Sequence, residues 1–325
     1  MTPPAAIAAR LRELGNGFKL PESQVLYAPL LAGQPTAGVL CHADQRYGPC
    51  PRHLLDVYQP QTVSTTPRPV LACFHGGGFI RGDKAAKANA GWYFARQGFV
   101  TVVPNYRLAP ESTWPSGPED VAAVLHWLQV NAARFGGDAR RVVLMGESAG
   151  AAHVAAAVLK RRFGADAAAG VRGAVLVSGP YNARLERLSR SAFGVATPDP
   201  RNDAYFGTDD AAALQAGSIA LQVDAAPLPL LISYAQRDLP QMQVQAGELF
   251  ARLSGDHGFA PELLCVPEHN HFSQGLAIQH RRRQPGRPGA GFHRAPCVIS
   301  RCAACATLRP PRPPAATRVP VSCWA

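Results

Sequence analysis

Residues 142–150 read Val-Val-Leu-Met-Gly-Glu-Ser-Ala-Gly, and the rest of the chain can be arranged around them. The apolar run before Gly146 predicts a buried strand, and the small residues from Ala151 to Leu159 predict a helix. Glycine at 146 and 150 leaves room where side chains would clash and tolerates the strained backbone of a very tight turn. The stretch therefore predicts a strand, a sharp turn and a helix, with Ser148 at the apex of the turn.

A serine presented in this way can act as a nucleophile. Gly-x-Ser-x-Gly between a strand and a helix is the pattern of a nucleophile elbow, which exposes the serine hydroxyl at the end of a sheet. A chance match is the alternative, because the chain is rich in alanine and glycine. The hydroxyl attacks well only when a base removes its proton, and an acid in turn orients that base. The interpretation therefore depends on finding both partners later in the chain.

The acid is expected on a loop after a late strand, because the chain order in such folds is serine, acid, histidine. Asp238 follows the apolar run 230–235 and meets this requirement. Asp224 and Asp209 precede the same run and fit less well. Asp238 is therefore predicted to orient the base.

Two neighbouring histidines compete for the role of the base. Residues 268–273 read Glu-His-Asn-His-Phe-Ser and follow another apolar run at 263–266. His271 lies nearer the start of the turn that follows and is the favoured base, with His269 as the alternative. Without the serine pattern, either histidine would be interpreted as a polar loop residue.

A second glycine-rich turn, His75-Gly76-Gly77-Gly78, follows the apolar run 69–74. Glycines contribute no packing here, but they let backbone N–H groups approach a developing oxyanion closely. Backbone N–H groups of this turn are predicted to act together with that of Ala149, and a generic glycine-rich turn is the alternative. A phosphate-binding loop is not expected, because no Lys-Ser/Thr follows the glycines.

Apolar runs that predict strands alternate with helical patterns along the chain. The strands are expected at 54–58, 69–74, 99–103, 141–145, 173–177, 228–235 and 263–266, and the helices at 84–97, 121–128, 151–159 and 242–253. Strands that are apolar throughout and alternate with helices are typical of a mostly parallel sheet covered on both faces. The predicted class is therefore α/β, with a central sheet flanked by helices on both faces.

Two segments do not follow this alternation. A short helix is predicted over residues 7–14, but residues 21–68 are expected to be irregular apart from one or two antiparallel edge strands. Residues 181–223 are too long for an ordinary connection after the sixth strand. We interpret residues 1–50 and 181–223 as cap elements over the carboxyl edge of the sheet.

Polar residues at 105–111 and 118–120 are predicted to form a cluster below the active site. Within it, Arg107 and Asp120 are expected to form an internal ion pair with a structural role.

The net charge of +11 does not indicate a nucleic-acid partner. Nine arginines lie in residues 275–325, where there is no acidic residue, and this leaves +2 for the preceding residues. No uncharged apolar run reaches the roughly 18 residues of a membrane span. The first 20 residues do not read as a secretory signal, so a cytoplasmic protein is expected.

Cysteine usage predicts reduced thiols and no metal. Cys41, Cys50, Cys73 and Cys265 are scattered through the main domain. The tail holds His293, Cys297, Cys302, Cys305 and Cys323, whose spacing lacks the second matched pair of a zinc site. No metal and no cofactor are predicted.

The sequence changes character after residue 275. The tail from 276 to 325 contains Arg281-Arg282-Arg283 and eight prolines between Pro285 and Pro320. Such a segment cannot form a helix that covers an apolar sheet face. We therefore expect residues 1–275 to be the catalytic domain and 276–325 to be a disordered tail or the product of a reading-frame shift.

These motifs together resemble the hormone-sensitive-lipase-like carboxylesterases of the α/β-hydrolase superfamily. The resemblance rests on His75–Phe79, on Tyr106–Glu111 and on the Gly146–Gly150 elbow, and it extends over about residues 45–275. Residues 47–49 and 55–58 also resemble relatives of kynurenine formamidase. Family members continue after the histidine into a helix, and this chain departs from that pattern.

The resemblance implies hydrolysis of small, uncharged acyl esters through an acyl-enzyme, without cofactor or metal. It implies Ser148 as nucleophile, His271 as base, Asp238 as its partner, and Gly76, Gly77 and Ala149 as the oxyanion hole. An arylformamidase-like amide hydrolase is the alternative, and a catalytically silent ligand-binding protein is a third. The expected partner is a small-molecule ester, and a homodimer is left open.

Overall fold

The centre of the molecule is an eight-stranded sheet with the strand order β1-β2-β4-β3-β5-β6-β7-β8. The computed structural model describes residues 3–164, 167–192, 194, 200–207 and 211–278. Its strands are β1 (Val39–Arg46), β2 (Leu54–Pro60), β3 (Arg68–Phe74), β4 (Val100–Pro104), β5 (Gly137–Glu147), β6 (Val171–Val177), β7 (Leu230–Arg237) and β8 (Glu262–Asn270). β1 with β2 and β2 with β4 pair antiparallel, and all other neighbours pair parallel. The mostly parallel sheet and its antiparallel edge strands are confirmed.

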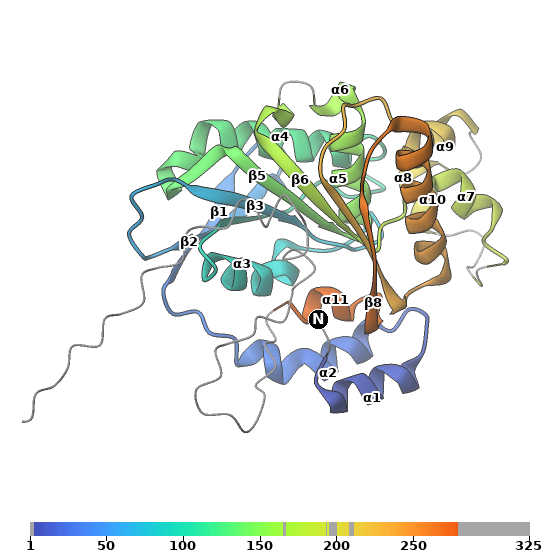
Figure 1. Cartoon of the computed structure of the whole chain (residues 1–325), viewed down its shortest axis with the longest axis horizontal. Coiled ribbons are helices and arrows are strands. Elements are labelled where there is room, and N and C mark those ends of the chain that lie inside the picture. The colour runs from blue at the N-terminus through green and yellow to red at the C-terminus, as the bar shows by residue number, and fades with distance from the viewer. Residues whose placement is uncertain (1–2, 165–166, 193, 195–199, 208–210, 279–325) are drawn as a thin grey trace, which may run out of the picture.

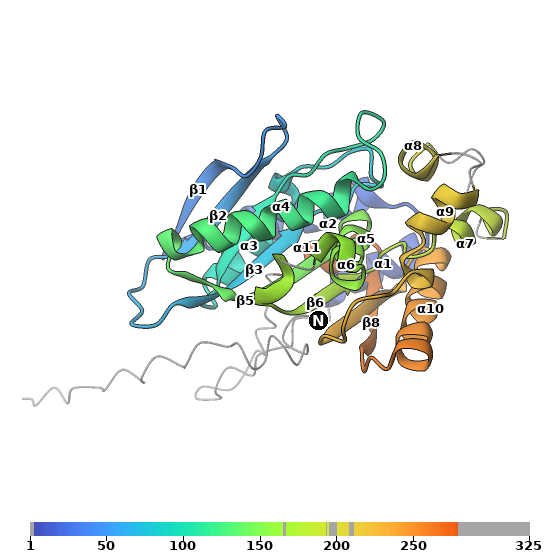
Figure 2. The ribbon, with the colours of Figure 1, turned by 90° about the horizontal axis from the view of Figure 1, so that it is seen from above.

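Helices cover both faces of this sheet. They are α1 (Ala5–Leu14), α2 (Leu20–Ala32), α3 (Ala88–Ala95), α4 (Ser116–Asn131), α5 (Ala149–Leu159), α6 (Arg161–Gly164), α7 (Ala183–Leu188), α8 (Asn202–Phe206), α9 (Ala211–Gly217), α10 (Pro240–His257) and α11 (Ser273–Leu276). The described residues also form the 3₁₀ turns η1 (Lys84–Lys87), η2 (Ala132–Phe135), η3 (Ala167–Gly170) and η4 (Ile219–Leu221). Figures 1 and 2 show α4 and α5 on one face and α3 and α11 on the other.

The core follows from the alternation of side chains along the buried strands. Val142 and Leu144 of β5 pack into a cluster with α4, α5 and α10. Val143 and Met145 point the other way, into a cluster with α3 and Ile278. Because both faces of each central strand are buried, every position needs an apolar residue, which explains the uninterrupted apolar runs.

The prediction that residues 21–68 begin irregularly was wrong, because α2 occupies Leu20–Ala32. Proline usually breaks a helix, but Pro21 lies in the first turn of α2. A backbone N–H at that position would have no hydrogen-bond partner within the helix, so its absence costs nothing there. Tyr27 of this helix is fully buried in a cluster with Leu11 and Ala277. Contacts with residues far along the chain therefore stabilise a helix that its composition does not indicate.

The predicted end of the domain at residue 275 was too early. Ala277 and Ile278 are 1% and 2% exposed and belong to the packed core. They bury apolar area under α2 and α3, whereas the arginine and proline run begins only later in the sequence. The interpretation of the tail and of its cysteines lies outside the described residues.

The segment after β6 forms short helices rather than strands. α7, α8, α9 and η4 follow it, and they lie beside α10 at one end of the sheet (Figure 1). α1 and α2 lie near α11 and β8, below the sheet in Figure 1. We continue to interpret both groups as cap elements.

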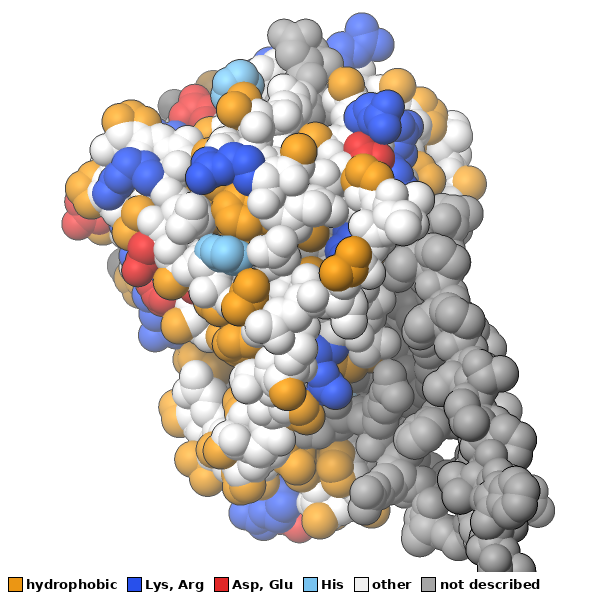
Figure 3. Space-filling model, turned by 90° about the vertical axis from the view of Figure 1, so that its left-hand side faces the viewer, with side chains coloured by type: hydrophobic (Ala, Val, Ile, Leu, Met, Phe, Trp, Pro, Cys, Tyr) orange, Lys and Arg blue, Asp and Glu red, His pale blue; other side chains and the backbone are white. Residues whose placement is uncertain are grey.

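The surface mixes residue types on the face shown in Figure 3. Basic, acidic and apolar side chains are interspersed across the described part of this face. Among the described residues, no helix combines the length and the apolar character that a membrane crossing requires.

Candidate active site

The turn at Ser148 has the strained geometry that its glycines predict. Ser148 has φ 53° and ψ −122°, between the end of β5 and the start of α5. A Cβ at Gly146 would lie 2.3 Å from the carbonyl oxygen of Gly150. A Cβ at Gly150 would lie 2.5 Å from the carbonyl oxygen of His75. Only glycine fits at either position, so the sequence pattern follows directly from the packing of the turn.

The three predicted side chains from separate loops meet at hydrogen-bond distance. His271 Nε2 lies 3.1 Å from Ser148 Oγ, and His271 Nδ1 lies 2.6 Å from Asp238 Oδ1. Asp238 is fully buried and His271 is 3% exposed. Each residue follows the carboxyl end of its strand, and parallel strands bring these ends to one edge of the sheet.

The carboxylate of Asp238 is held by several donors besides His271. Its Oδ1 accepts from the backbone N–H of Leu239, and its Oδ2 accepts from that of Ala235, both at 2.9 Å. Ser178 Oγ also donates to Oδ2 at 2.5 Å and accepts from Gln274 Nε2 at 2.6 Å. A buried carboxylate needs such donors, and here they also fix its orientation toward the histidine.

The rival residues have other partners. His269 Nδ1 lies 2.8 Å from Ser273 Oγ, inside the turn that carries His271. Asp224 accepts from the backbone N–H of Arg161 at 2.7 Å. Asp209 lies outside the described residues. The structure therefore brings His271 and Asp238, rather than His269 or Asp224, to Ser148.

The glycine-rich turn after β3 lies against the elbow. Gly77 has φ 145°, and a Cβ there would lie 1.8 Å from the carbonyl oxygen of Arg81. Gly76, Gly77 and Ala149 line the same pocket as Ser148. His75 stacks on Tyr106 at 4.2 Å between ring centroids, and burial lowers its pKa to about 4. A neutral, buried His75 therefore anchors the first residue of this turn.

The predicted polar cluster is present beneath the turn. Arg107 donates from its backbone N–H and from Nε to Asp120 at 2.7 and 2.8 Å. His53 Nε2 lies 3.1 Å from the same carboxylate. The predicted internal ion pair is confirmed, and it ties the loop after β4 to the start of α4.

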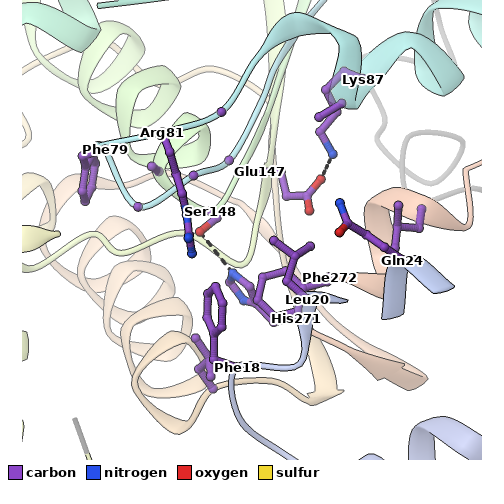
Figure 4. Close-up of a pocket in the computed structure, with 18 of the residues that line it drawn as sticks. Phe18, Leu20, Gln24, Phe79, Arg81, Lys87, Glu147, Ser148, His271 and Phe272 are labelled. Carbon is purple, nitrogen blue, oxygen red and sulfur yellow. Dashed lines mark hydrogen bonds and ion pairs between the residues drawn. The ribbon is translucent and has the colours of Figure 1, made fainter. Parts of the chain in front are cut away.

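A pocket of about 710 Å³ opens in front of Ser148. Its lining comes from the Phe18–Gln34 segment, the glycine-rich turn, η1, the elbow, the loop of His271, the start of α10 and residues 186, 201 and 202. Figure 4 shows His271 directed at Ser148, with Phe18 and Leu20 of the N-terminal segment near His271 and Gln24 nearer to Glu147 and Lys87. The N-terminal segment thus forms part of the pocket wall.

Comparison with known proteins identifies the family of this fold. A family model described as alpha/beta hydrolase fold matches residues 71–272, which is more than half of the chain. The chain belongs to the α/β-hydrolase fold family. The predicted fold class and the resemblance to carboxylesterases of this family are confirmed.

Named relatives of this α/β-hydrolase are esterases. It is 37% identical to Esterase LipC of Mycobacterium tuberculosis over 105 residues, which are 32% of this chain and 26% of the relative. It is 41% identical to Carboxylesterase NlhH of the same organism over 99 residues, 29% of this chain and 30% of the relative. The solved structure of a bacterial heroin esterase matches 85% of this chain and 92% of that chain with a TM-score of 0.65 and 26% identity. The chain thus spans less than a third of the length of these two sequence relatives.

Several polar residues of this α/β-hydrolase site were not predicted from the sequence. Lys87 of η1 and Glu147 of the elbow form a buried ion pair in the pocket wall, and burial lowers the pKa of Lys87. Gly275 lies against both side chains. Ser178 and Gln274 support Asp238 as described above. A lysine in a helical pattern indicates a solvent-exposed face, so its sequence position carried no signal of this pairing.

No group of three or more potential metal ligands occurs among the described residues. Cys41, Cys50 and Cys265 are free thiols in the described part of the chain.

Proposed function

We propose that the chain is a serine carboxylesterase that hydrolyses small acyl esters through an acyl-enzyme intermediate. The observation that carries the proposal is the continuous contact from Ser148 Oγ through His271 to Asp238. The named esterase relatives support the same reaction class.

In the first half-reaction, Ser148 Oγ attacks the ester carbonyl carbon while His271 Nε2 takes its proton. Asp238 accepts the hydrogen bond from Nδ1, which holds the correct tautomer and stabilises the imidazolium. The carbonyl oxygen becomes an oxyanion, for which backbone N–H groups of Gly76, Gly77 and Ala149 are the proposed donors. The bond to the alkoxide then breaks, and His271 returns the proton to the leaving alcohol.

In the second half-reaction, water replaces the alcohol. His271 Nε2 takes a proton from the water as its oxygen attacks the acyl carbon. When the second tetrahedral intermediate collapses, Ser148 Oγ leaves and receives that proton. The products are one alcohol and one carboxylic acid, and no cofactor takes part.

The test is a panel of p-nitrophenyl esters of graded acyl length, with an N-formyl aromatic amide beside them. We expect turnover of short-chain esters and a loss of about 10⁴-fold or more in the folded Ser148→Ala variant. A variant that retained a tenth of the rate would contradict the proposal. Preference for the formyl amide over every ester would instead support the amide hydrolase.

A further inference from the structure

The pocket contains an arginine, Arg81, that has no role in the proposed hydrolysis of an uncharged ester. Arg81 lies between the glycine-rich turn and η1 and lines the pocket together with Ser148 and Phe18. Its guanidinium carbon lies 5.1 Å from the centre of the Phe18 ring. Figure 4 shows its side chain extending from the loop into the pocket on the side of Ser148. A permanent positive charge therefore faces the space that the substrate would occupy.

No described residue of the protein neutralises this charge. Among the described residues, no carboxylate lies within ion-pair distance of the Arg81 guanidinium. Among the described residues, two carboxylates line the pocket, and both have other partners. Glu147 pairs with Lys87, and Glu186 accepts from Asn202 and from Gln245. An anion that enters the pocket would thus find a cation available for binding.

Aromatic contacts connect this cation with the reacting groups. Phe18 packs edge-on against Phe272 at 4.9 Å, and Phe272 packs against the His271 ring at 4.9 Å. The guanidinium of Arg201 lies 5.9 Å from the same Phe18 ring. Two guanidinium groups from separate segments therefore lie near one ring close to the proposed base.

We propose that Arg81 binds a carboxylate carried by the ester substrate, so that anionic esters are preferred over the uncharged esters expected from the sequence. The planar guanidinium matches a carboxylate with two parallel hydrogen bonds, and stacking on Phe18 limits its orientations. The inference rests on the proposed esterase function and names the substrate class of the same site.

Two matched pairs of substrates test the preference and show which part of the ester carries the charge. In the first pair, monomethyl glutarate carries a carboxylate on its acyl part and is compared with the neutral methyl valerate. In the second pair, acetoxyacetate carries the carboxylate on its alcohol part and is compared with the neutral propyl acetate. Hydrolysis is followed by titration of the released acid. We expect kcat/KM to favour the anionic ester at least tenfold in one pair, and less in 1 M salt because screening weakens the attraction.

Arg81→Gln is expected to reduce that anionic-to-neutral ratio about tenfold, mainly through KM. Arg96→Gln is the matched control, since Arg96 is exposed at the end of α3 and does not line the pocket. Its ratio should equal that of the wild type. An unchanged ratio in Arg81→Gln, or a wild-type preference for both neutral esters, would overturn the proposal.

A binding measurement separates this inference from the proposed function. Calorimetry with monomethyl glutarate and with acetoxyacetate on the Ser148→Ala variant needs no turnover. At least one should bind, and adding Arg81→Gln should weaken that binding about tenfold. If no ester is hydrolysed but binding depends on Arg81, the esterase proposal fails and anion binding stands. Binding that is absent, or equal with and without Arg81, contradicts the anion site.

Discussion

Acidification from pH 7 to pH 5 is expected to weaken the fold through two buried histidines, His75 and His153. His75 is fully buried beside Tyr106, and His153 of α5 is 1% exposed among aromatic rings. Neither ring nitrogen of His153 has a hydrogen-bond partner in the described structure. Burial lowers the pKa of His75 to about 4 and that of His153 to about 3.

The sign and size of the effect follow from these pKa values. Unfolded histidine takes up a proton near its ordinary pKa of 6.5, whereas both folded groups stay neutral until about pH 4 or below. Between these limits the unfolded state binds more protons, so stability is lost as the pH falls. At about 1.4 kcal/mol per pH unit, each site costs about 2 kcal/mol at pH 5. Their sum of about 4 kcal/mol is a large part of the roughly 5–15 kcal/mol that stabilises a typical protein.

Urea unfolding at pH 7, 6 and 5 measures this loss. His153→Leu removes one of the two sites, so the loss between pH 7 and pH 5 should shrink by about 2 kcal/mol. His126→Leu is the matched control, because His126 is exposed on α4 and its replacement removes no buried histidine. The same loss in His153→Leu as in the wild type would refute the assignment.

Three further predictions concern the elbow, the polar cluster and the base. Gly146→Ala should cost stability by about 1–3 kcal/mol or more and nearly abolish ester turnover, because its Cβ meets backbone at 2.3 Å; thermal unfolding that matched the wild type would contradict this. Asp120→Ala should destabilise by about 3–5 kcal/mol in urea unfolding, whereas Glu13→Ala, in an exposed ion pair, should change stability by less than about 1 kcal/mol; equal effects would count against the cluster. His271→Ala should reduce kcat about as much as loss of the serine, and His269→Ala far less; steady-state kinetics with the reverse order would move the base to His269.

The fold could be predicted largely because its central strands are buried on both faces. Such strands must be apolar throughout, and their alternation with helices determines a parallel sheet. The helix α2 could not be predicted in this way. Its buried Tyr27 packs against Ala277, a residue 250 positions later, and its prolines indicated irregular structure. Long-range packing, rather than local propensity, decides that segment.

Some residues of the candidate site could likewise be predicted from the sequence, and others could not. The turn of the elbow is local, because Gly146, Ser148 and Gly150 lie within five residues. The Gly-x-Ser-x-Gly pattern therefore predicts it. Asp238 and His271 could be predicted because chain order and strand ends constrain them. Ser178 supports Asp238, but it shares no motif with that residue and is joined to it only where β6 and β7 are neighbours. The role proposed for Arg81 likewise depends on its position in the pocket, which no sequence motif indicates.

Covalent trapping of the nucleophile tests the central claim most directly. The full chain is treated with diethyl p-nitrophenyl phosphate, whose phosphoryl group transfers to an activated serine with release of p-nitrophenol, and the modified peptide is located by mass spectrometry. The account predicts one diethylphosphoryl group on Ser148, no such adduct in Ser148→Ala, and a reaction slowed by orders of magnitude in His271→Ala. Labelling of another residue at the same rate, or undiminished labelling of Ser148 in His271→Ala, would contradict the proposed serine, histidine and aspartate mechanism.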